Sequence, residues 1–143
     1  MRGWLRRIGY APVRSGLRRN PGWSPELVQK LAELVERTAA LSGRPISIVG
    51  HSVGGVLARS IAVRRPQQVR RVVAIGSPLI IGRERAPSEV KMASIYSRDD
   101  VVVRPSRAVA QESHASNFEV RGSHVGLANN PEVYRHLARL LAE

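Results

Sequence analysis

The chain has 143 residues, a length that fits one domain with a modest core, so we expect a single domain over residues 1–143. Hydrophobic residues at 43% and charged residues at 24% exclude a wholly disordered or collagen-like chain, and the absence of cysteine excludes disulfides, thiolate nucleophiles and cysteine-bound zinc. The net charge of +12 is spread along the chain without a nucleic-acid-binding motif. It predicts an arginine-rich solvated surface and no specific nucleic-acid partner.

The N-terminal segment combines apolar and basic residues. Trp4, Leu5 and Ile8 are interrupted by Arg6 and Arg7, so they do not form the apolar core of a signal peptide. No stretch of the sequence reaches the roughly 18 apolar residues that a membrane-spanning helix needs, and we therefore expect a soluble, cytoplasmic protein. The segment is predicted to be a short helix that packs its apolar residues inward, with weak contact to an anionic membrane surface as the alternative.

The next elements are a short strand, a turn and a long helix. Residues 10–13 are predicted to be extended, and residues 18–23, with the sequence RRNPGW, form a turn. A helix is expected from Pro25, with Ser24 as its N-cap, because apolar residues repeat at helical spacing until Ser42 and Gly43 end the pattern.

Strands and helices then alternate along the chain. Residues 46–49, 72–75 and 92–96 are short apolar runs typical of buried parallel strands, and an alternating run at 118–121 is typical of an edge strand. A helix separates the first two of these strands, and a last helix begins at Pro131 behind the N-cap Asn130. This alternation predicts the α/β class, with a mostly parallel sheet flanked by helices.

The turn after the first buried strand carries a nucleophile motif. Gly50, His51, Ser52, Val53 and Gly54 match G-x-S-x-G, and the motif requires a strand that runs into the turn and a helix that leaves it, as this pattern predicts. The turn holds its serine in a strained backbone conformation, so we expect Gly50 and Gly54 to allow strand and helix to approach closely. Ser52 is therefore the candidate nucleophile.

A serine hydroxyl needs a neighbouring base, and the base needs an acid that orients it. Asp99 and Asp100 follow the strand that ends near residue 97, and His124 follows the strand that ends near residue 121. The chain order of nucleophile, acid and base is the order used by enzymes with this strand-turn-helix motif. The candidates are Ser52, His124 and one of the two aspartates.

Other histidines and the second aspartate are the competing candidates. His51 adjoins the serine and is expected to point away into the structure, and His136 sits in the last helix. His114 lies in a polar stretch and is the rival base. Asp99 is the alternative acid, and is otherwise a solvated turn residue.

Four segments, residues 48–55, 76–78, 94–103 and 120–127, resemble the serine lipases and esterases of the α/β-hydrolase superfamily. Together they span most of residues 24–143. The resemblance implies that Asp100, just before a small apolar run, is the acid. It also implies that the backbone N–H of Val53 is one of two oxyanion-hole donors, and that the reaction needs neither a cofactor nor a metal.

The resemblance is not complete. In the family, a strand with a His-Gly type loop precedes the starting helix and gives the second oxyanion donor, and this chain begins after that position. We therefore expect a partial α/β-hydrolase domain that lacks its first strands and has an open sheet edge through which it could self-associate. The span between Pro78 and Lys91 is too short for the helical cap domain that many relatives insert over the site.

The sequence thus predicts a serine hydrolase that cleaves carboxylic esters or acyl lipids through an acyl-enzyme, with a small-molecule or lipid ester as substrate. Two alternatives remain open. The chain could be a weakly active or inactive hydrolase remnant that binds another chain through its open edge. It could also be a thioesterase or acyltransferase that uses the same three residues.

Overall fold

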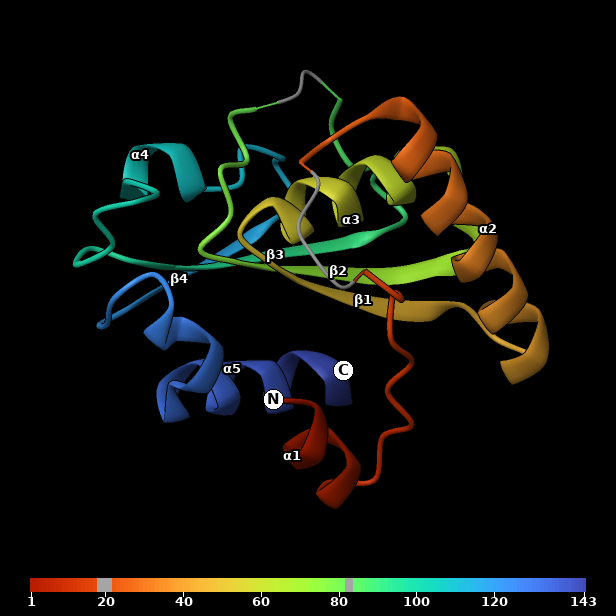
Figure 1. Cartoon of the computed structure of the whole chain (residues 1–143), viewed down its shortest axis with the longest axis horizontal. Helices are drawn as coiled ribbons and strands as arrows, with labels where there is room; N and C mark the ends of the chain where they lie inside the picture. Colours follow the sequence, from red (N-terminus) through yellow and green to blue (C-terminus); the bar gives the residue numbers. More distant parts are fainter. Residues whose placement is uncertain (18–21, 82–83) are drawn as a thin grey trace.

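A parallel sheet of four strands forms the centre of the protein. In the computed structural model, which describes residues 1–17, 22–81 and 84–143, the strands follow the spatial order β1-β2-β3-β4. Each neighbouring pair is parallel (Figure 1). A helix connects β1 to β2 and a four-residue helix lies between β3 and β4, whereas the described residues between β2 and β3 hold no helix. The predicted α/β class is confirmed. The strands are β1 (Ile46–His51), β2 (Val69–Ile75), β3 (Lys91–Ser97) and β4 (Ser116–Val120).

Helices cover both faces of this sheet, so its strands are shielded from water on two sides (Figure 1). On one face lie α2 (Pro25–Ser42), α3 (Val53–Arg64) and α4 (Pro105–Ala108), and on the other lie α1 (Arg2–Arg7) and α5 (Pro131–Ala142). Two short 3-10 helices, η1 (Pro66–Gln68) and η2 (Gly126–Asn129), complete the described elements.

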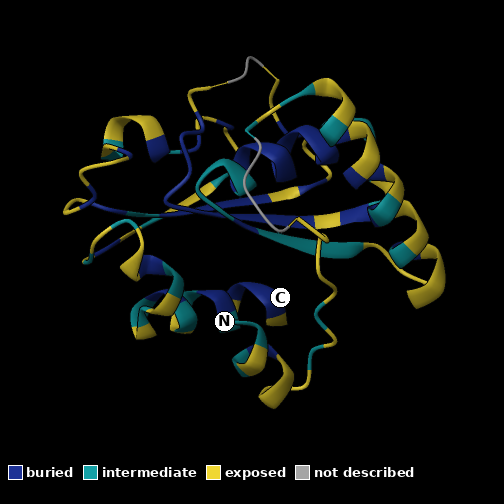
Figure 2. Cartoon of the chain, viewed as in Figure 1, coloured by how far each residue is buried: buried dark blue, intermediate teal, exposed yellow. Residues whose placement is uncertain are grey.

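The core has two layers, one on each side of the sheet. Because successive side chains of a strand point to opposite faces, β2 contributes to both layers. Val72 and Ala74 pack with residues of α2 and α3, whereas Val73 and Ile75 pack with residues of α5. Figure 2 shows the buried residues along the sheet and on the inner sides of the helices. This packing fixes the strand ends, where the candidate site residues lie.

The predicted start and end of α2 and the predicted start of α5 are confirmed. The Ser24 hydroxyl accepts a hydrogen bond from the Leu27 N–H at 3.2 Å, and Gly43 ends α2 in the left-handed conformation with φ of 64°. The Asn130 side chain accepts from the Glu132 N–H at 2.8 Å and so begins α5. The same Asn130 side chain donates to the Arg121 carbonyl, which ties α5 to the loop after β4.

Two predictions for the N-terminal region are wrong. Residues 10–13 form no strand. Pro12 lacks the N–H that pairing in a sheet requires, and residues of this segment and of β1 together line a groove of about 870 Å³. Ile8 is 41% exposed rather than packed inward, because α1 ends at Arg7 and only Leu5 of the helix is buried. The turn predicted at 18–23 falls mostly outside the described residues.

The edges of the sheet differ from each other in length and in surroundings. β4 is an edge strand, as predicted, and pairs only with β3 among the described strands. β1 forms the other edge and pairs only with β2 within the same set. Residues of β1 line the groove described above. Self-association through this edge stays a prediction.

Strand bounds were predicted less well than strand positions. β2 starts at Val69, three residues before the predicted start at 72. The prediction started late because Arg70 and Arg71 interrupt the apolar pattern of the sequence. Arg71 is nonetheless buried, and its guanidinium is 3.0 Å from the Glu143 carboxylate.

The four-residue α4 was not predicted, since it is too short to show a helical period. None of the helices in the described ranges is long and apolar enough to cross a bilayer.

Candidate active site

Ser52 lies at the sharp turn between β1 and α3. Its φ of 56° and ψ of −130° make it the one non-glycine residue with positive φ in the described part of the chain. Such a conformation costs of order 1–3 kcal/mol and persists only where the surroundings impose it. Here the Ser52 N–H donates to the Ile75 carbonyl of β2 at 2.9 Å, and α3 leaves directly from Val53. The turn presents the hydroxyl at the carboxyl edge of the sheet.

The close approaches around this turn involve Gly50 and Gly55, and the expected role of Gly54 is wrong. A Cβ on Gly50 would lie 2.2 Å from the Gly54 carbonyl oxygen, and a Cβ on Gly55 would lie 2.1 Å from the Ser77 hydroxyl oxygen. A Cβ on Gly54 would meet no atom within 4 Å. The helix therefore approaches β1 over Gly50, and it approaches the segment after β2 over Gly55.

Three predicted residues lie in one line of hydrogen bonds. The Ser52 Oγ is 3.1 Å from the His124 Nε2, and the His124 Nδ1 is 2.7 Å from the Asp100 Oδ2. A carboxylate can only accept, so Nδ1 carries a hydrogen and Nε2 is the acceptor for the serine O–H in a neutral ring. The three side chains come from the loops after β1, β3 and β4, whose carboxyl ends meet at one edge of the sheet.

Asp100 is buried, and its carboxylate is held from both oxygens. The Asp100 Oδ1 accepts from the Val102 and Val103 N–H groups at 2.8 Å each, while Oδ2 accepts from His124. Burial acts to raise the pKa of Asp100, but the hydrogen bonds from Val103, His124 and Val102 outweigh it and hold the pKa below its ordinary value. Asp100 is therefore an anion beside the imidazole.

Gly76 forms the wall behind the Asp100 and His124 pair, a role the sequence did not indicate. Its φ is 52°, and a Cβ there would lie 2.9 Å from the Leu127 Cδ1 and 3.3 Å from the Asp100 Oδ2. Any larger residue would push against the acid. The only signal in the sequence was the position of Gly76 directly after a buried strand, where glycine allows a sharp turn.

His51 lies against the candidate base, so the expectation that it points away is wrong. The His51 Nε2 is 2.9 Å from the His124 carbonyl oxygen, and the two rings are 4.9 Å apart at 37°. Because a carbonyl oxygen accepts, the His51 Nε2 is the donor. The residue before the nucleophile therefore holds the backbone of the residue that faces the nucleophile.

The competing residues lie outside this line of hydrogen bonds. Asp99 is exposed, and its Oδ1 accepts from the Arg121 guanidinium at 3.4 Å. His114 is exposed before the start of β4, at the opposite edge of the sheet from the carboxyl ends of the strands. The His136 ring contacts Phe118 with centroids 4.6 Å apart.

The backbone next to Ser52 offers a hydrogen-bond donor. Val53 is the first residue of α3, so no carbonyl within the helix accepts its N–H. The N-terminal end of a helix also carries partial positive charge, which favours an anion there.

Within residues 1–17, 22–81 and 84–143, no three His, Asp or Glu side chains gather in a way that would hold a metal ion.

This parallel sheet flanked by helices is the fold of the α/β hydrolases. The sequence profile of the Esterase family matches residues 9–138, and the chain belongs to that family. Solved structures with the same fold include an alpha/beta superfamily hydrolase from Xanthomonas campestris pv. campestris, with 22% identity, a TM-score of 0.74, and coverage of 96% of this chain and 84% of that one.

Two further structures resemble the chain at the level of the fold. An alpha/beta hydrolase of unknown function from Agrobacterium tumefaciens is 15% identical with a TM-score of 0.70, over 99% of this chain and 75% of that one. The type II thioesterase BorB from the borrelidin biosynthetic cluster is 17% identical with a TM-score of 0.60, over 80% of this chain and 70% of that one.

Proposed function

We propose that the protein hydrolyses carboxylic esters, including acyl lipids, through an acyl-enzyme on Ser52. In the first half-reaction the Ser52 Oγ attacks the ester carbonyl carbon and His124 accepts the hydroxyl proton at Nε2. Asp100 orients the ring and stabilises the imidazolium. The C–O bond of the ester then breaks, and the proton passes from His124 to the leaving alcohol.

Water completes the reaction in the second half. His124 takes a proton from a water molecule, whose oxygen attacks the acyl carbon, and Ser52 leaves with that proton. The charge that develops on the carbonyl oxygen is stabilised by the Val53 N–H at the start of α3. Apart from this water molecule, the proposed steps use only side chains and backbone groups of the chain.

The observation that carries the proposal is the unbroken line from nucleophile to base to acid. The two distances, 3.1 Å from Ser52 to His124 and 2.7 Å from His124 to Asp100, fall within the reach of hydrogen bonds. The strained conformation of Ser52 supports it independently, because strain of this kind is concentrated at functional sites.

A fluorophosphonate probe tests the nucleophile, since it reacts with an activated serine. We expect the protein to become labelled, Ser52→Ala to lose the label, and Ser113→Ala, which removes an exposed hydroxyl, to keep it. Mass spectrometry of the labelled peptide locates the modified residue. A label on another serine would overturn the assignment, and no label on a folded protein would favour the binding role instead.

A thioesterase activity is the second candidate, and the fold shared with BorB favours testing it. A thioester carbonyl offers the same target to Ser52, with a thiol instead of an alcohol as leaving group. The test compares turnover of p-nitrophenyl butyrate with turnover of butyryl-coenzyme A. A preference for the ester supports the first proposal, and a preference for the thioester supports the second.

A further inference from the structure

Large aliphatic side chains are exposed on the loops that carry the candidate site. Those loops follow β2, β3 and β4, and in each of them at least one such side chain is more than half exposed. The residues are Ile80 (57%), Ile81 (53%), Val101 (90%), Val102 (66%) and Val125 (75%). A cluster of this kind marks a surface that contacts something other than water.

Hydrogen bonds show that the loops lie together. Val102 donates to Asp100, which bonds to His124, and Val125 follows His124 in the chain. The Ile80 N–H donates to the Arg107 carbonyl at 3.2 Å, which brings the loop after β2 against the α4 segment after β3. The exposed aliphatic side chains therefore surround the carboxyl edge of the sheet, where Ser52 is presented. We call this set of five residues the aliphatic rim.

Unbalanced positive charge adjoins the aliphatic rim. Arg104 directly precedes α4 and Arg107 lies in its last turn. Both are exposed, and neither forms an ion pair with a described residue. Other arginines at this edge are neutralised, because Arg98 pairs with Glu119 and Arg121 with Asp99.

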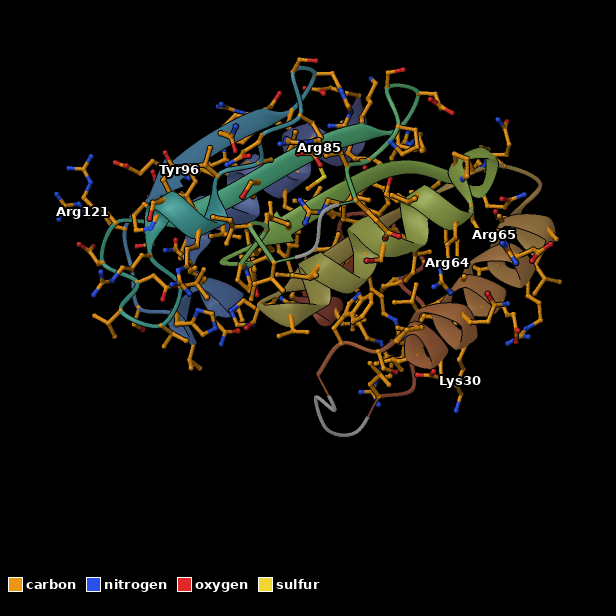
Figure 3. The ribbon with its side chains drawn as sticks, turned by 90° about the horizontal axis from the view of Figure 1, so that it is seen from above. Lys30, Arg64, Arg65, Arg85, Tyr96 and Arg121 are labelled. Atoms are coloured by element: carbon orange, nitrogen blue, oxygen red, sulfur yellow. The ribbon has the colours of Figure 1, made fainter. Side chains whose placement is uncertain are left out.

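Figure 3 places Arg121 at the carboxyl end of the sheet, far from Lys30, Arg64 and Arg65 beside α2 and α3. Basic residues are therefore common over the whole protein, in keeping with the net charge of +12. What distinguishes the carboxyl edge is the combination of aliphatic side chains with Arg104 and Arg107, which form no ion pair with a described residue.

From this combination we infer that the carboxyl edge of the sheet docks on an anionic lipid surface. The aliphatic rim enters the boundary between headgroups and acyl chains, and Arg104 and Arg107 contact the anionic headgroups. The docked protein presents Ser52 to acyl esters held in that surface. This last step rests on the proposed esterase function, whereas docking itself does not.

The composition of the rim favours a lipid surface over a protein partner. Its five residues are valine and isoleucine, with no aromatic residue or methionine, whereas the strongest anchors of protein interfaces are tryptophan, tyrosine and arginine. Aliphatic side chains beside cations match a surface that is apolar below and anionic above.

The test uses the Ser52→Ala protein, so that binding is measured without turnover. Sedimentation is compared for vesicles of phosphatidylcholine alone and of phosphatidylcholine with about 30 mol% phosphatidylglycerol. We expect binding to the anionic vesicles, weakening as salt rises above about 0.1 M, and much weaker binding to the neutral ones. Equal binding to both vesicles, or no binding to either at low salt, would overturn the inference.

Matched variants locate the docking surface. Val101→Ser with Val125→Ser should weaken binding by roughly tenfold or more, since both side chains leave water on docking. Leu41→Ser is the control, because Leu41 is also 90% exposed but lies at the end of α2, beside the opposite edge of the sheet. An equal loss in the Leu41 variant would overturn the inference.

The arginines are tested in the same way. Arg104→Gln with Arg107→Gln should weaken binding to anionic vesicles by roughly tenfold or more at low salt. The control pair, Arg37→Gln with Arg44→Gln, removes the same charge from the far end and should change binding far less. Equal losses in both pairs would show that net charge alone drives binding and would overturn the assigned surface.

Thermal melting of each variant verifies that it is folded. The docking inference and the proposed esterase function can be contradicted independently, because vesicle binding is measured on the Ser52→Ala protein, which lacks the nucleophile. If the wild-type protein bound vesicles but took no fluorophosphonate label, the proposed esterase function would fail and the docking surface would stand.

Discussion

The His51 Nε2 donates a hydrogen bond to the His124 carbonyl oxygen at 2.9 Å, so two loops at the carboxyl edge of the sheet are joined beside Ser52. His51 ends β1, and His124 lies in the loop after β4, at the far side of the sheet in strand order. The contact fixes the backbone of the candidate base relative to the strand that leads into the nucleophile. His51 is thus a positioning residue for the proposed reaction.

Replacing His51 tests this role. His51→Ala should lower kcat by roughly 10- to 100-fold, because a small displacement of a catalytic group from its productive geometry has effects of this size. KM should change little, since no substrate contact is removed. His51→Gln should retain most of the activity because its amide can donate the same hydrogen bond. Equal losses in the two variants, in steady-state turnover of p-nitrophenyl butyrate, would contradict the positioning role.

The two adjacent aspartates should differ sharply in effect. Asp100→Asn removes the carboxylate that holds the His124 ring in the tautomer with hydrogen on Nδ1, so we expect turnover to fall by about 10³- to 10⁴-fold. Asp99→Asn should lower turnover by less than about threefold, because Asp99 contacts only an exposed arginine. The reverse ranking of the two variants would move the acid role to Asp99.

Asp100 should also give the protein a dependence of stability on pH. Its pKa is lower in the folded than in the unfolded chain, so the ionised form stabilises the fold fully above the ordinary value of about 3.9. That contribution is lost as the pH falls through the lowered pKa. Urea unfolding of the wild-type protein and of Asp100→Asn should therefore show a difference in free energy that narrows below about pH 4. A constant difference between pH 7 and pH 3 would argue against this account.

Local patterns in the sequence were sufficient to predict most of the fold. The caps at Ser24 and Asn130 predicted two helix starts. Apolar runs predicted the positions of the first three strands, and an alternating run predicted the fourth. Ser52, Asp100 and His124 each follow a predicted parallel strand, and these positions predicted that they would meet, because parallel strands end at one edge. Their catalytic roles stay predictions.

What the sequence did not reveal depends on contacts between distant segments. Nothing near Gly76 in the chain indicates that Asp100 and Leu127 pack against it. Likewise, His51 contacts a carbonyl 73 residues further along, a partner that local spacing does not predict. The motif also indicated the wrong second glycine, because it describes the turn and not the Ser77 side chain that packs against Gly55.

The three glycines of the turn should respond differently to alanine. Gly50→Ala and Gly55→Ala should each destabilise the protein by about 3 kcal/mol. The new methyl groups would lie 2.2 Å from the Gly54 carbonyl oxygen and 2.1 Å from the hydroxyl oxygen of the buried Ser77. Gly54→Ala should be neutral or stabilise the protein by up to about 1 kcal/mol, since alanine favours the helix and the space is open. Thermal or urea unfolding measures all three. Strong destabilisation by Gly54→Ala would show that the space beside it is filled in solution.

A buried ion pair connects the helix of the nucleophile to the loop after β2. The Arg59 guanidinium donates to the Leu79 and Ile81 carbonyls at 2.6 Å and 3.0 Å, and its Nη1 is 3.8 Å from the Glu112 Oε1. That oxygen also accepts from the Ala86 N–H at 3.2 Å. Burial lowers the pKa of Arg59, Glu112 acts to raise it, and the guanidinium stays charged.

Removing the cation alone should therefore be costly. Arg59→Met leaves the Glu112 carboxylate buried without its counter-ion, and we expect the free energy of unfolding to fall by about 3–5 kcal/mol. Arg59→Met combined with Glu112→Met should recover part of that loss, because no unpaired charge remains. The control Arg37→Met, at an exposed position of α2, should change stability by less than about 0.5 kcal/mol. Urea unfolding of the four proteins provides the comparison. If the double variant were less stable than Arg59→Met alone, the hydrogen bonds of Arg59 and not the charge balance would dominate at this position.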